Sequence, residues 1–327
     1  MSAEWDEIQK ELRRMRLAIA ILSVIVILLG LLVGLLFQSR QTTIANAMNE
    51  VPAMEKGDDS VRVNSEFFLP SLPIPDTLSL AGEPVPLHQA DLRERYEFEL
   101  LVTTYRQSAT ILGFKRAARW FPIIEPLLAS QGIPDDFKYL CVIESNLSHA
   151  ISPSNAVGFW QFLEGTARQY GLEVNEDVDE RYHVEKSTLA ACKYLKDAYR
   201  KFGSWTLAAA SYNMGMAGLD KQMEEQGEKD YYRLKLNQET SRYIFRMAVT
   251  KELFEHPDKY GFRFTPEELY APISTQKLSV DKQVSDWVTF AKEHGTTYYM
   301  LKELNPWLRS KQLRNPMHKT YEIQLPN

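Results

Sequence analysis

The stretch CVIESNLSHA (residues 141–150) ends a helical pattern with a glutamate on its apolar side. Phe137, Leu140 and Cys141 recur at the spacing of one helix face, and Glu144 occupies the next place on that face. Such a pattern predicts a helix that packs against a core by this face. Glu144 is therefore expected to point inward, where an apolar residue would be usual.

Both ends of this helix are marked in the sequence. Pro134 and the acidic pair Asp135 and Asp136 favour a helix start, and Asn146 favours the end. Glu144 would then lie near the carboxyl end, where partial burial and the negative end of the helix dipole both raise the pKa of a carboxyl group. A carboxyl group that stays protonated near neutral pH can act as the acid in cleavage of a glycosidic bond. The alternative is a helix-end glutamate turned to solvent.

Composition excludes several other classes of function. The chain has 327 residues, 44% of them hydrophobic and 25% charged, and its net charge is -5. It has no basic stripe, so we do not expect nucleic acid as a partner. The six histidines show no paired metal spacing, and no phosphate-binding Gly-Lys loop is present, so neither a metal nor another cofactor is expected. Cys141 and Cys192 lie among apolar neighbours in helical patterns, which predicts buried thiols.

A charge-free run from Leu17 to Phe37 predicts a transmembrane helix over residues 17–37. At about 1.5 Å per residue it spans roughly 30 Å, the thickness of the hydrocarbon core of a bilayer. Basic residues cluster in the preceding segment 1–16, so the positive-inside rule predicts a cytoplasmic tail there and export of everything after residue 37. A cleaved signal peptide is the alternative, because Ala45-Asn46-Ala47 resembles a cleavage site, but the apolar run exceeds the usual ~7–15 residues.

The rest of the chain divides into three parts by composition. Residues 38–87 are polar and then rich in proline, which predicts an extended, semi-rigid linker. Residues 88–272 have helical periodicity almost throughout, with Gly203 marking the end of one helix and Ser204 the start of the next. Almost nothing in this range alternates with the period of a strand, so we expect a mainly α domain.

The last part, residues 273–327, is predicted to be a small module with an apolar pattern of its own. It follows a junction at Pro272 and contains two strand-like runs, KLSV and YEIQLP, around two helical stretches. Strand, helix, helix and strand in so few residues predict a compact βααβ unit.

Three short motifs downstream of Glu144 add polar and aromatic side chains. GFWQF (158–162) offers a glycine for close backbone approach, aromatic rings for stacking on sugars, and an amide for sugar hydroxyls. SYNMG (211–215) sets a tyrosine and an asparagine at a helix end, and ETSRY (239–243) brings a second tyrosine near an arginine. Taken singly, such motifs are more commonly core packing or helix stops.

In this order and spacing, the motifs resemble the soluble lytic transglycosylase family of lysozyme-like domains, which cleave bacterial peptidoglycan. The resemblance covers about residues 126–261, and the stretch 178–215 is similar to the membrane-bound type D subgroup. It implies a lysozyme-like helical catalytic domain over residues 88–272. The sequence departs from the family pattern at Ser211, where alanine is usual, and at Leu163-Glu164, where Met-Pro often follows the glutamine.

The resemblance implies a reaction and the residues that carry it. Glu144 would protonate the bond between N-acetylmuramic acid and N-acetylglucosamine, and then help the muramoyl 6-hydroxyl close a 1,6-anhydro ring. No second carboxylate belongs to the matched motifs, so this one residue would act as acid and base. The implied catalytic residue is Glu144, and the implied substrate-binding residues are Ser145, Gly158, Phe159, Gln161, Tyr212, Asn213 and Tyr243.

The family also implies a place and a partner. The catalytic domain would act in the periplasm on peptidoglycan glycan strands during cell wall remodelling. The N-terminal helix predicted from the sequence would anchor the chain in the bacterial inner membrane, which differs from the lipoprotein form common in that subgroup. Residues 273–327 are similar to a LysM domain, a peptidoglycan-binding fold, but Asp281-Lys282-Gln283 stands where Gly-Asp is usual. Glycan binding by this module is thus left open.

Two other functions fit the same sequence. One is a hydrolase of the same fold, of lysozyme or chitinase type, with Asp179 or Glu180 as its second carboxylate. The other is a non-catalytic peptidoglycan-binding protein in which Glu144 is inert.

Overall fold

A computed structural model describes residues 71–327 of the chain. The predicted transmembrane helix, residues 17–37, and its cytoplasmic tail lie outside the described residues. Between residues 71 and 327, no helix is both long and apolar enough to cross a membrane.

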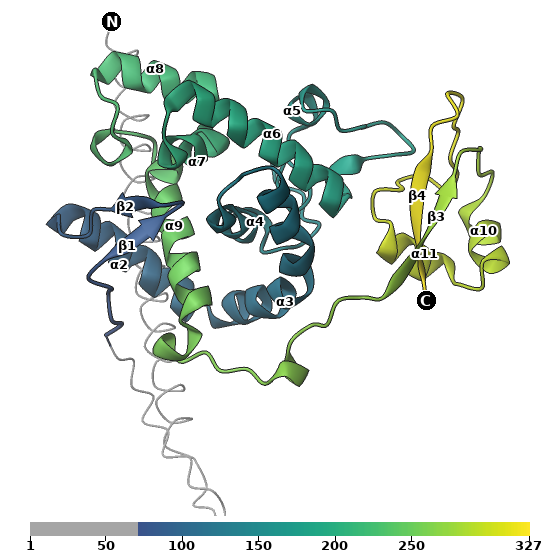
Figure 1. Cartoon of the computed structure of the whole chain (residues 1–327), viewed down its shortest axis with the longest axis horizontal. Coiled ribbons are helices and arrows are strands. Elements are labelled where there is room, and N and C mark those ends of the chain that lie inside the picture. The colour runs from purple at the N-terminus through teal and green to yellow at the C-terminus, as the bar shows by residue number, and fades with distance from the viewer. Residues whose placement is uncertain (1–70) are drawn as a thin grey trace, which may run out of the picture. The chain divides into compact units, whose positions relative to one another are not determined.

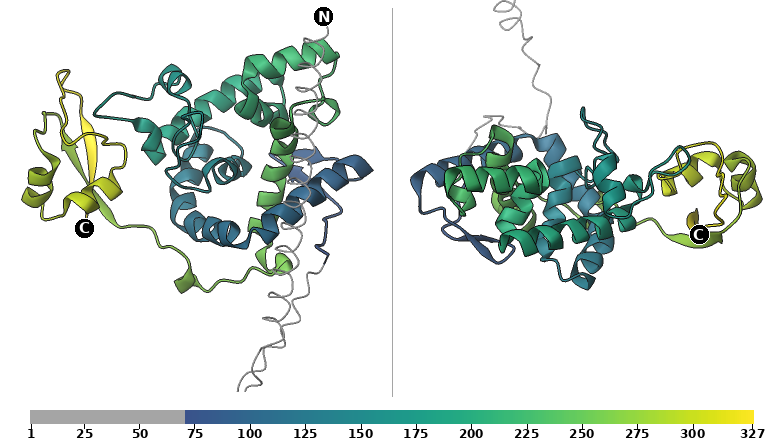
Figure 2. Two further views of the ribbon diagram at one scale, coloured as in Figure 1. Left: turned by 180° about the vertical axis from the view of Figure 1, so that it is seen from behind. Right: turned by 90° about the horizontal axis from the view of Figure 1, so that it is seen from above.

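Helices dominate the part of the chain before residue 273, as the periodicity predicts (Figure 1). The helices of this part are α2 (Ala90–Tyr105), α3 (Gln107–Ser130), α4 (Lys138–Ser145), α5 (Glu164–Gln169), α6 (Val184–Phe202), α7 (Trp205–Met214), α8 (Met216–Gln226) and α9 (Gln238–Glu255). A ring is formed by α2, α3, α6, α7 and α9, in which each helix contacts the next and α9 returns to α2. The short helix α4 lies inside the ring against α3 and α9 (Figures 1 and 2).

The helix ends follow the signals in the sequence. Gly203 ends α6 in the left-handed conformation, with φ of 69°, and the Ser204 hydroxyl accepts the backbone N–H of Leu207 at 3.3 Å to begin α7. Asn146 likewise ends α4 at φ 52°. Asp135–Phe137 form a short 3-10 turn before α4, so the helix itself begins slightly later than the proline and acidic residues predict.

One apolar cluster fills the ring and surrounds α4. Its largest members, each almost fully buried, are Trp160, Tyr96, Tyr243, Phe137, Phe159 and Phe245. Cys141 and Cys192 belong to the same cluster as free, buried thiols, which confirms that prediction. Burying an apolar side chain of this size stabilises a fold by about 1.5–3 kcal/mol, so the cluster holds α4 firmly in place.

A short hairpin precedes α2 inside the range predicted as linker. Strand β1 (Leu78–Leu80) pairs antiparallel with β2 (Glu83–Val85) through a turn at Ala81 and Gly82, both of which have positive φ. Leu80 and Val85 are buried in the main cluster. Residues 78–87 are therefore part of the folded domain, which corrects the prediction of an extended spacer for this end of the linker.

The hairpin also supplies a cap to a distant helix. The Glu83 carboxylate accepts the backbone N–H of Trp205 at 2.6 Å and that of Thr206 at 2.9 Å, at the start of α7. Burial raises the pKa of Glu83, but the Thr206 hydroxyl, these two N–H groups and the Ser204 hydroxyl donate to the carboxylate and lower it overall. An anion is also favourable at a helix N-terminus. The high proline content of the region concealed this role in the sequence.

The C-terminal part is a βααβ unit, as predicted. Strands β3 (Thr275–Val280) and β4 (Tyr321–Pro326) pair antiparallel, with Val280 opposite Tyr321, around helices α10 (Trp287–Glu293) and α11 (Tyr298–Leu304). Its apolar cluster is built on Trp287, Leu308 and Ile323.

This C-terminal cluster is not closed within the unit. Val157, Val178 and Tyr182, all from the helical domain, are buried members of it. The expectation of a module with a separate apolar pattern is therefore incomplete. The sequence could not reveal this, because these three residues lie more than a hundred positions before the module's own core residues.

Candidate active site

Glu144 occupies the last turn of α4 and points toward α9. Its carboxylate accepts a hydrogen bond from the Tyr243 hydroxyl of α9, which joins two residues 99 positions apart in the sequence. Glu144 is half-buried, so the prediction that it faces inward is confirmed and the solvent-facing alternative is wrong.

Burial raises the pKa of Glu144 from 4.5 to about 7. The Tyr243 hydrogen bond and the positive charge of Arg246 oppose this rise, and the negative charge of Glu239 adds to it. At neutral pH the side chain is thus divided between its acid and carboxylate forms. A group in this state can both give and take a proton.

Glu144 lines a cleft of roughly 610 Å³. The walls come from the junction of α2 and α3, the carboxyl end of α4 and one face of α9 along its length. The charged residues of the lining, besides Glu144, are Glu99, Arg106, Glu239, Arg242 and Arg246. A cleft of this size with a few convergent polar groups is a typical ligand site.

The cleft contains a second carboxylate that sequence reasoning passed over. Glu239 lies on the first turn of α9 and accepts the Asn213 amide at 3.1 Å. It belongs to the ETSRY motif, in which the tyrosine and the arginine drew attention and this carboxylate did not. Glu99 also lines the cleft, where it is paired with Arg242.

Neither carboxylate proposed for the hydrolase alternative lines the cleft. Asp179 is buried in an ion pair with Arg181 at 2.7 Å, and Glu180 is paired with Lys186. Both belong to the segment that contacts the C-terminal unit. The carboxylates that line the cleft together with Glu144 are Glu99 and Glu239.

The GFWQF motif supports the site through its backbone carbonyls. Phe159 and Trp160 are 1% and 0% exposed, so the expectation that these rings stack on sugars is wrong. Their backbone carbonyls accept hydrogen bonds from site residues instead. The Phe159 carbonyl accepts the Ser145 hydroxyl at 3.0 Å, and the Trp160 carbonyl accepts the Tyr212 hydroxyl at 2.8 Å. The motif thereby fixes the end of α4 and the end of α7.

Gly158 and Gln161 adopt backbone conformations that are rare for residues with a side chain. Gly158 has φ of 80°, and a Cβ there would lie 2.1 Å from the backbone oxygen of Arg181. The absence of a side chain at Gly158 lets these two backbone segments pack closely. Gln161 has φ of 47°, and its amide donates to the carbonyls of Ala150 at 3.1 Å and Gly158 at 2.8 Å.

Asn213 and Tyr212 join α7 to the site. The Asn213 side chain accepts the Thr240 hydroxyl at 2.6 Å and donates to Glu239, so it holds the start of α9. Tyr212 is half-buried, and burial together with the nearby Glu144 raises its pKa. The structure therefore brings together Glu144, Tyr243, Tyr212 and Ser145, and places Asn213 beside Glu239.

Comparison with known families decides what kind of domain holds this cleft. Residues 122–235 match the family of transglycosylase SLT domains, and residues 276–327 match the soluble lytic transglycosylase C-terminal LysM-like domain. The chain carries an SLT transglycosylase domain and a LysM-like C-terminal domain. The SLT match includes Glu144, the GFWQF motif and Tyr212, and it ends before Glu239 and Tyr243 of the same domain.

Curated relatives agree with the family match. The chain is 26% identical over 228 residues to membrane-bound lytic murein transglycosylase D of Escherichia coli strain K12, a match that covers 68% of this chain and 49% of the relative. The same protein from Escherichia coli O6:H1 gives the same values. A putative tributyltin chloride resistance protein of Alteromonas is 26% identical over 113 residues, 34% of this chain and 55% of that one. The chain thus spans about half the length of the curated relatives it matches.

Proposed function

We propose that the SLT domain is a lytic transglycosylase that cleaves the β-1,4 bond between N-acetylmuramic acid and N-acetylglucosamine in peptidoglycan. The observation that carries this proposal is Glu144, a carboxyl group with a pKa of about 7 that lines the cleft and is hydrogen-bonded by Tyr243. The SLT family match supports the reaction class, and the murein transglycosylase relative supports the substrate.

The proposed reaction uses Glu144 twice. In its acid form Glu144 gives a proton to the glycosidic oxygen, so the bond to C1 of the muramoyl unit breaks and N-acetylglucosamine leaves with a free 4-hydroxyl. The resulting carboxylate then takes the proton of the muramoyl 6-hydroxyl, whose oxygen bonds to C1 and forms the 1,6-anhydro ring. No water is consumed, and the attacking oxygen belongs to the substrate, so the entropic cost of a second reactant is small.

Hydrolysis by the same site is the second candidate, and Glu239 is the observation that favours it. Hydrolysing glycosidases generally use two carboxylates, one as acid and one as base or nucleophile. Glu239 lines the cleft with Glu144 and raises its pKa, so it is close enough to interact electrostatically. Against this role, Glu239 is already engaged by the Asn213 amide.

Digestion of purified sacculi separates the two candidates. The products of the proposed reaction carry 1,6-anhydro-muramoyl ends, whereas hydrolysis gives reducing ends that are heavier by one water. We expect mass spectrometry of the released muropeptides to find anhydro ends. Reducing ends would establish the hydrolase, and binding to sacculi without any released product would establish a non-catalytic protein.

The acid role of Glu144 predicts a defined pH dependence. Only the protonated form can start the reaction, so kcat/KM is expected to fall about tenfold per pH unit above a pH near 7. Tyr243→Phe removes a hydrogen bond that favours the carboxylate, so the alkaline limb should move to higher pH. Glu239→Gln removes a negative charge that disfavours it, so the limb should move to lower pH.

These opposite shifts are measured as pH profiles of kcat/KM on soluble glycan strands. Arg246 also acts on Glu144, and it is unchanged in both variants. Shifts of the same sign for the two variants, or none, would contradict the assignment of the titrating group to Glu144.

We propose further that residues 17–37 anchor the enzyme in the cytoplasmic membrane with the catalytic domain outside. The proposal rests on the charge-free run and the basic residues before it, and the membrane-bound relative supports an envelope location. Alkaline phosphatase fused after Gln41 should be active, because it folds only when exported, and the fusion should sediment with membranes. Activity of a cytoplasmic reporter at the same position would overturn the orientation.

A further inference from the structure

The LysM-like module contacts the SLT domain mainly through residues 173–183, called here the bridging segment, with further contacts at Val157 and Glu185. The Asp179 N–H donates to the Trp307 carbonyl at 2.9 Å, and the Arg309 N–H donates to the Asp177 carbonyl at 2.8 Å. Between these bonds Val178 pairs with Leu308. The two parts are thus joined by a short stretch of paired backbone.

Side chains reinforce this junction. The Arg314 guanidinium contacts both Asp177 oxygens, at 2.8 and 3.0 Å, and Glu176 at 2.7 Å. The Arg309 guanidinium lies 4.1 Å from the centre of the Tyr182 ring. Charged pairs alone are weak at a surface, but here they surround the shared apolar cluster of Val157, Val178 and Tyr182.

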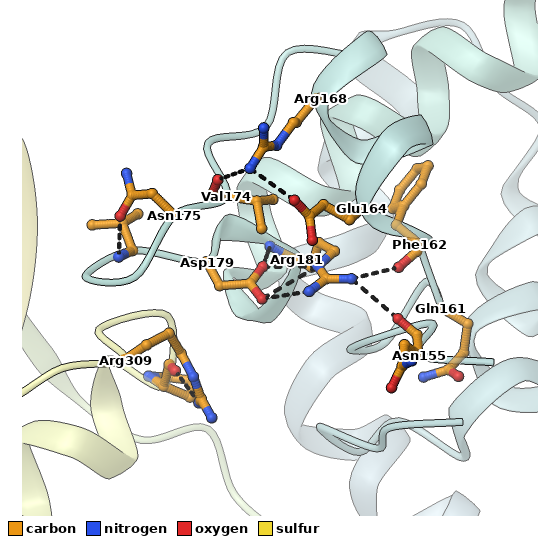
Figure 3. A network of polar contacts seen from close by, with 12 residues as sticks. Asn155, Gln161, Phe162, Glu164, Arg168, Val174, Asn175, Asp179, Arg181 and Arg309 are labelled. Atoms are coloured by element: carbon orange, nitrogen blue, oxygen red, sulfur yellow. Dashed lines mark hydrogen bonds and ion pairs between the residues drawn. The ribbon is translucent and has the colours of Figure 1, made fainter. Parts of the chain in front are cut away.

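The bridging segment also carries Arg181, which is buried and points away from the module (Figure 3). Its guanidinium is paired with Asp179 and donates to the backbone carbonyls of Asn155 at 3.2 Å and Phe162 at 3.3 Å. Arg181 therefore binds the first and last residues of the segment 155–162, called here the Gln161 loop. Its own backbone oxygen packs on Gly158 of the same loop.

The Gln161 loop in turn fixes the active site. It accepts the Ser145 hydroxyl next to Glu144 and the Tyr212 hydroxyl, and Gln161 itself has a positive φ that must be held by its surroundings. A continuous set of contacts thus runs from the LysM-like module through Asp177–Asp179 and Arg181 to the Gln161 loop.

We propose that the LysM-like module is a positioning part of the catalytic site, which sets the Gln161 loop through the bridging segment. This inference rests on the proposed function. A binding module on a flexible tether raises the local concentration of substrate and leaves the chemical step unchanged. A module that positions the site instead changes kcat, even on short soluble glycans that need no capture at the wall.

The test uses the full-length protein with two arginines of the module replaced, Arg309→Ala with Arg314→Ala. We expect kcat on soluble glycan strands to fall about tenfold, because small displacements of a catalytic group cost this much or more. Sacculus binding in pull-down should stay unchanged. The matched control removes the same charge elsewhere on the module, Lys292→Ala with Lys311→Ala, and should keep the original kcat. Within residues 71–327, neither control side chain forms a hydrogen bond or an ion pair with the SLT domain.

Two further measurements separate positioning from stabilisation. When lysines replace the two arginines instead, kcat should recover only in part, because lysine keeps the charge but cannot contact both Asp177 oxygens and Glu176 at once. In a Gln161→Ala background, the same arginine replacements should have little further effect, because residues that act through one loop are not additive. The inference would be overturned if the double arginine variant melted at a lower temperature but kept its kcat at 25 °C. It would also be overturned if the arginine replacements lowered kcat by the same factor with and without Gln161→Ala. If the unaltered protein gives no anhydro products, the proposed function fails instead.

Discussion

Replacement of Glu144 by glutamine is expected to lower kcat on peptidoglycan by at least about a hundredfold, with the fold intact. The amide is nearly the same size but cannot give and recover a proton. The measurement is the release of anhydro-muropeptides from sacculi by the purified variant. An enzyme that retains its activity after Glu144→Gln would remove the basis of the proposed mechanism.

The stability of this variant provides an internal control. The folded pKa of Glu144, about 7, lies above its ordinary value of 4.5, so ionisation disfavours the folded state. The penalty is absent below pH 4.5 and complete above pH 7, where it corresponds to about 3 kcal/mol. Glu144→Gln should therefore unfold at a higher temperature than the unaltered protein at pH 8 and at a similar temperature at pH 4. Equal melting temperatures at both pH values would show that Glu144 is not desolvated.

Gly158→Ala is expected to damage both stability and activity. The added Cβ would lie 2.1 Å from the backbone oxygen of Arg181, and φ of 80° is itself unfavourable for alanine. Together these effects should lower the free energy of unfolding by at least about 2 kcal/mol. Because the Gln161 loop must move to relieve the contact, kcat should also fall about a hundredfold. Thermal unfolding measures the loss of stability, and kinetics at 25 °C measure the loss of kcat.

Gly165→Ala is the matched control for this substitution. Gly165 lies in α5, close to Gly158 in the sequence, and a Cβ there would meet nothing within 4 Å. Alanine is the better helix former by about 1 kcal/mol, so this variant should be as stable as the unaltered protein or slightly more so. If the two variants have the same stability and the same kcat, the close approach at Gly158 affects neither property.

The sequence predicted best what short-range patterns determine. Helical spacing placed Glu144 on the inner face of α4, and Asn146, Gly203 and Ser204 marked helix ends where the structure has them. The βααβ order of the C-terminal unit also followed from local patterns. These features depend on residues within a few positions of one another, so a single sequence contains the whole signal.

What the sequence missed depends on contacts between distant segments. Phe159 has the composition of a sugar-stacking residue, but only the packing of the ring shows that it is buried. The partner of Glu83 lies more than a hundred positions away, at the start of α7, so the hairpin looked like a linker. The second carboxylate was sought beside Arg181, whereas the fold brings Glu239 to the cleft.

The hydrogen bond between Tyr243 and Glu144 has a consequence for when the enzyme first becomes active. The two residues are 99 positions apart, and the Glu99–Arg242 ion pair of the same cleft joins residues 143 positions apart. Contacts of such long range form late in folding, because a large loop must close before they can be made. A chain that emerges from its N-terminus onward has α4 long before α9, so it holds the acid without its partner. The proposed cleavage of peptidoglycan is thus expected only after α9, the last α-helix of the domain, has docked.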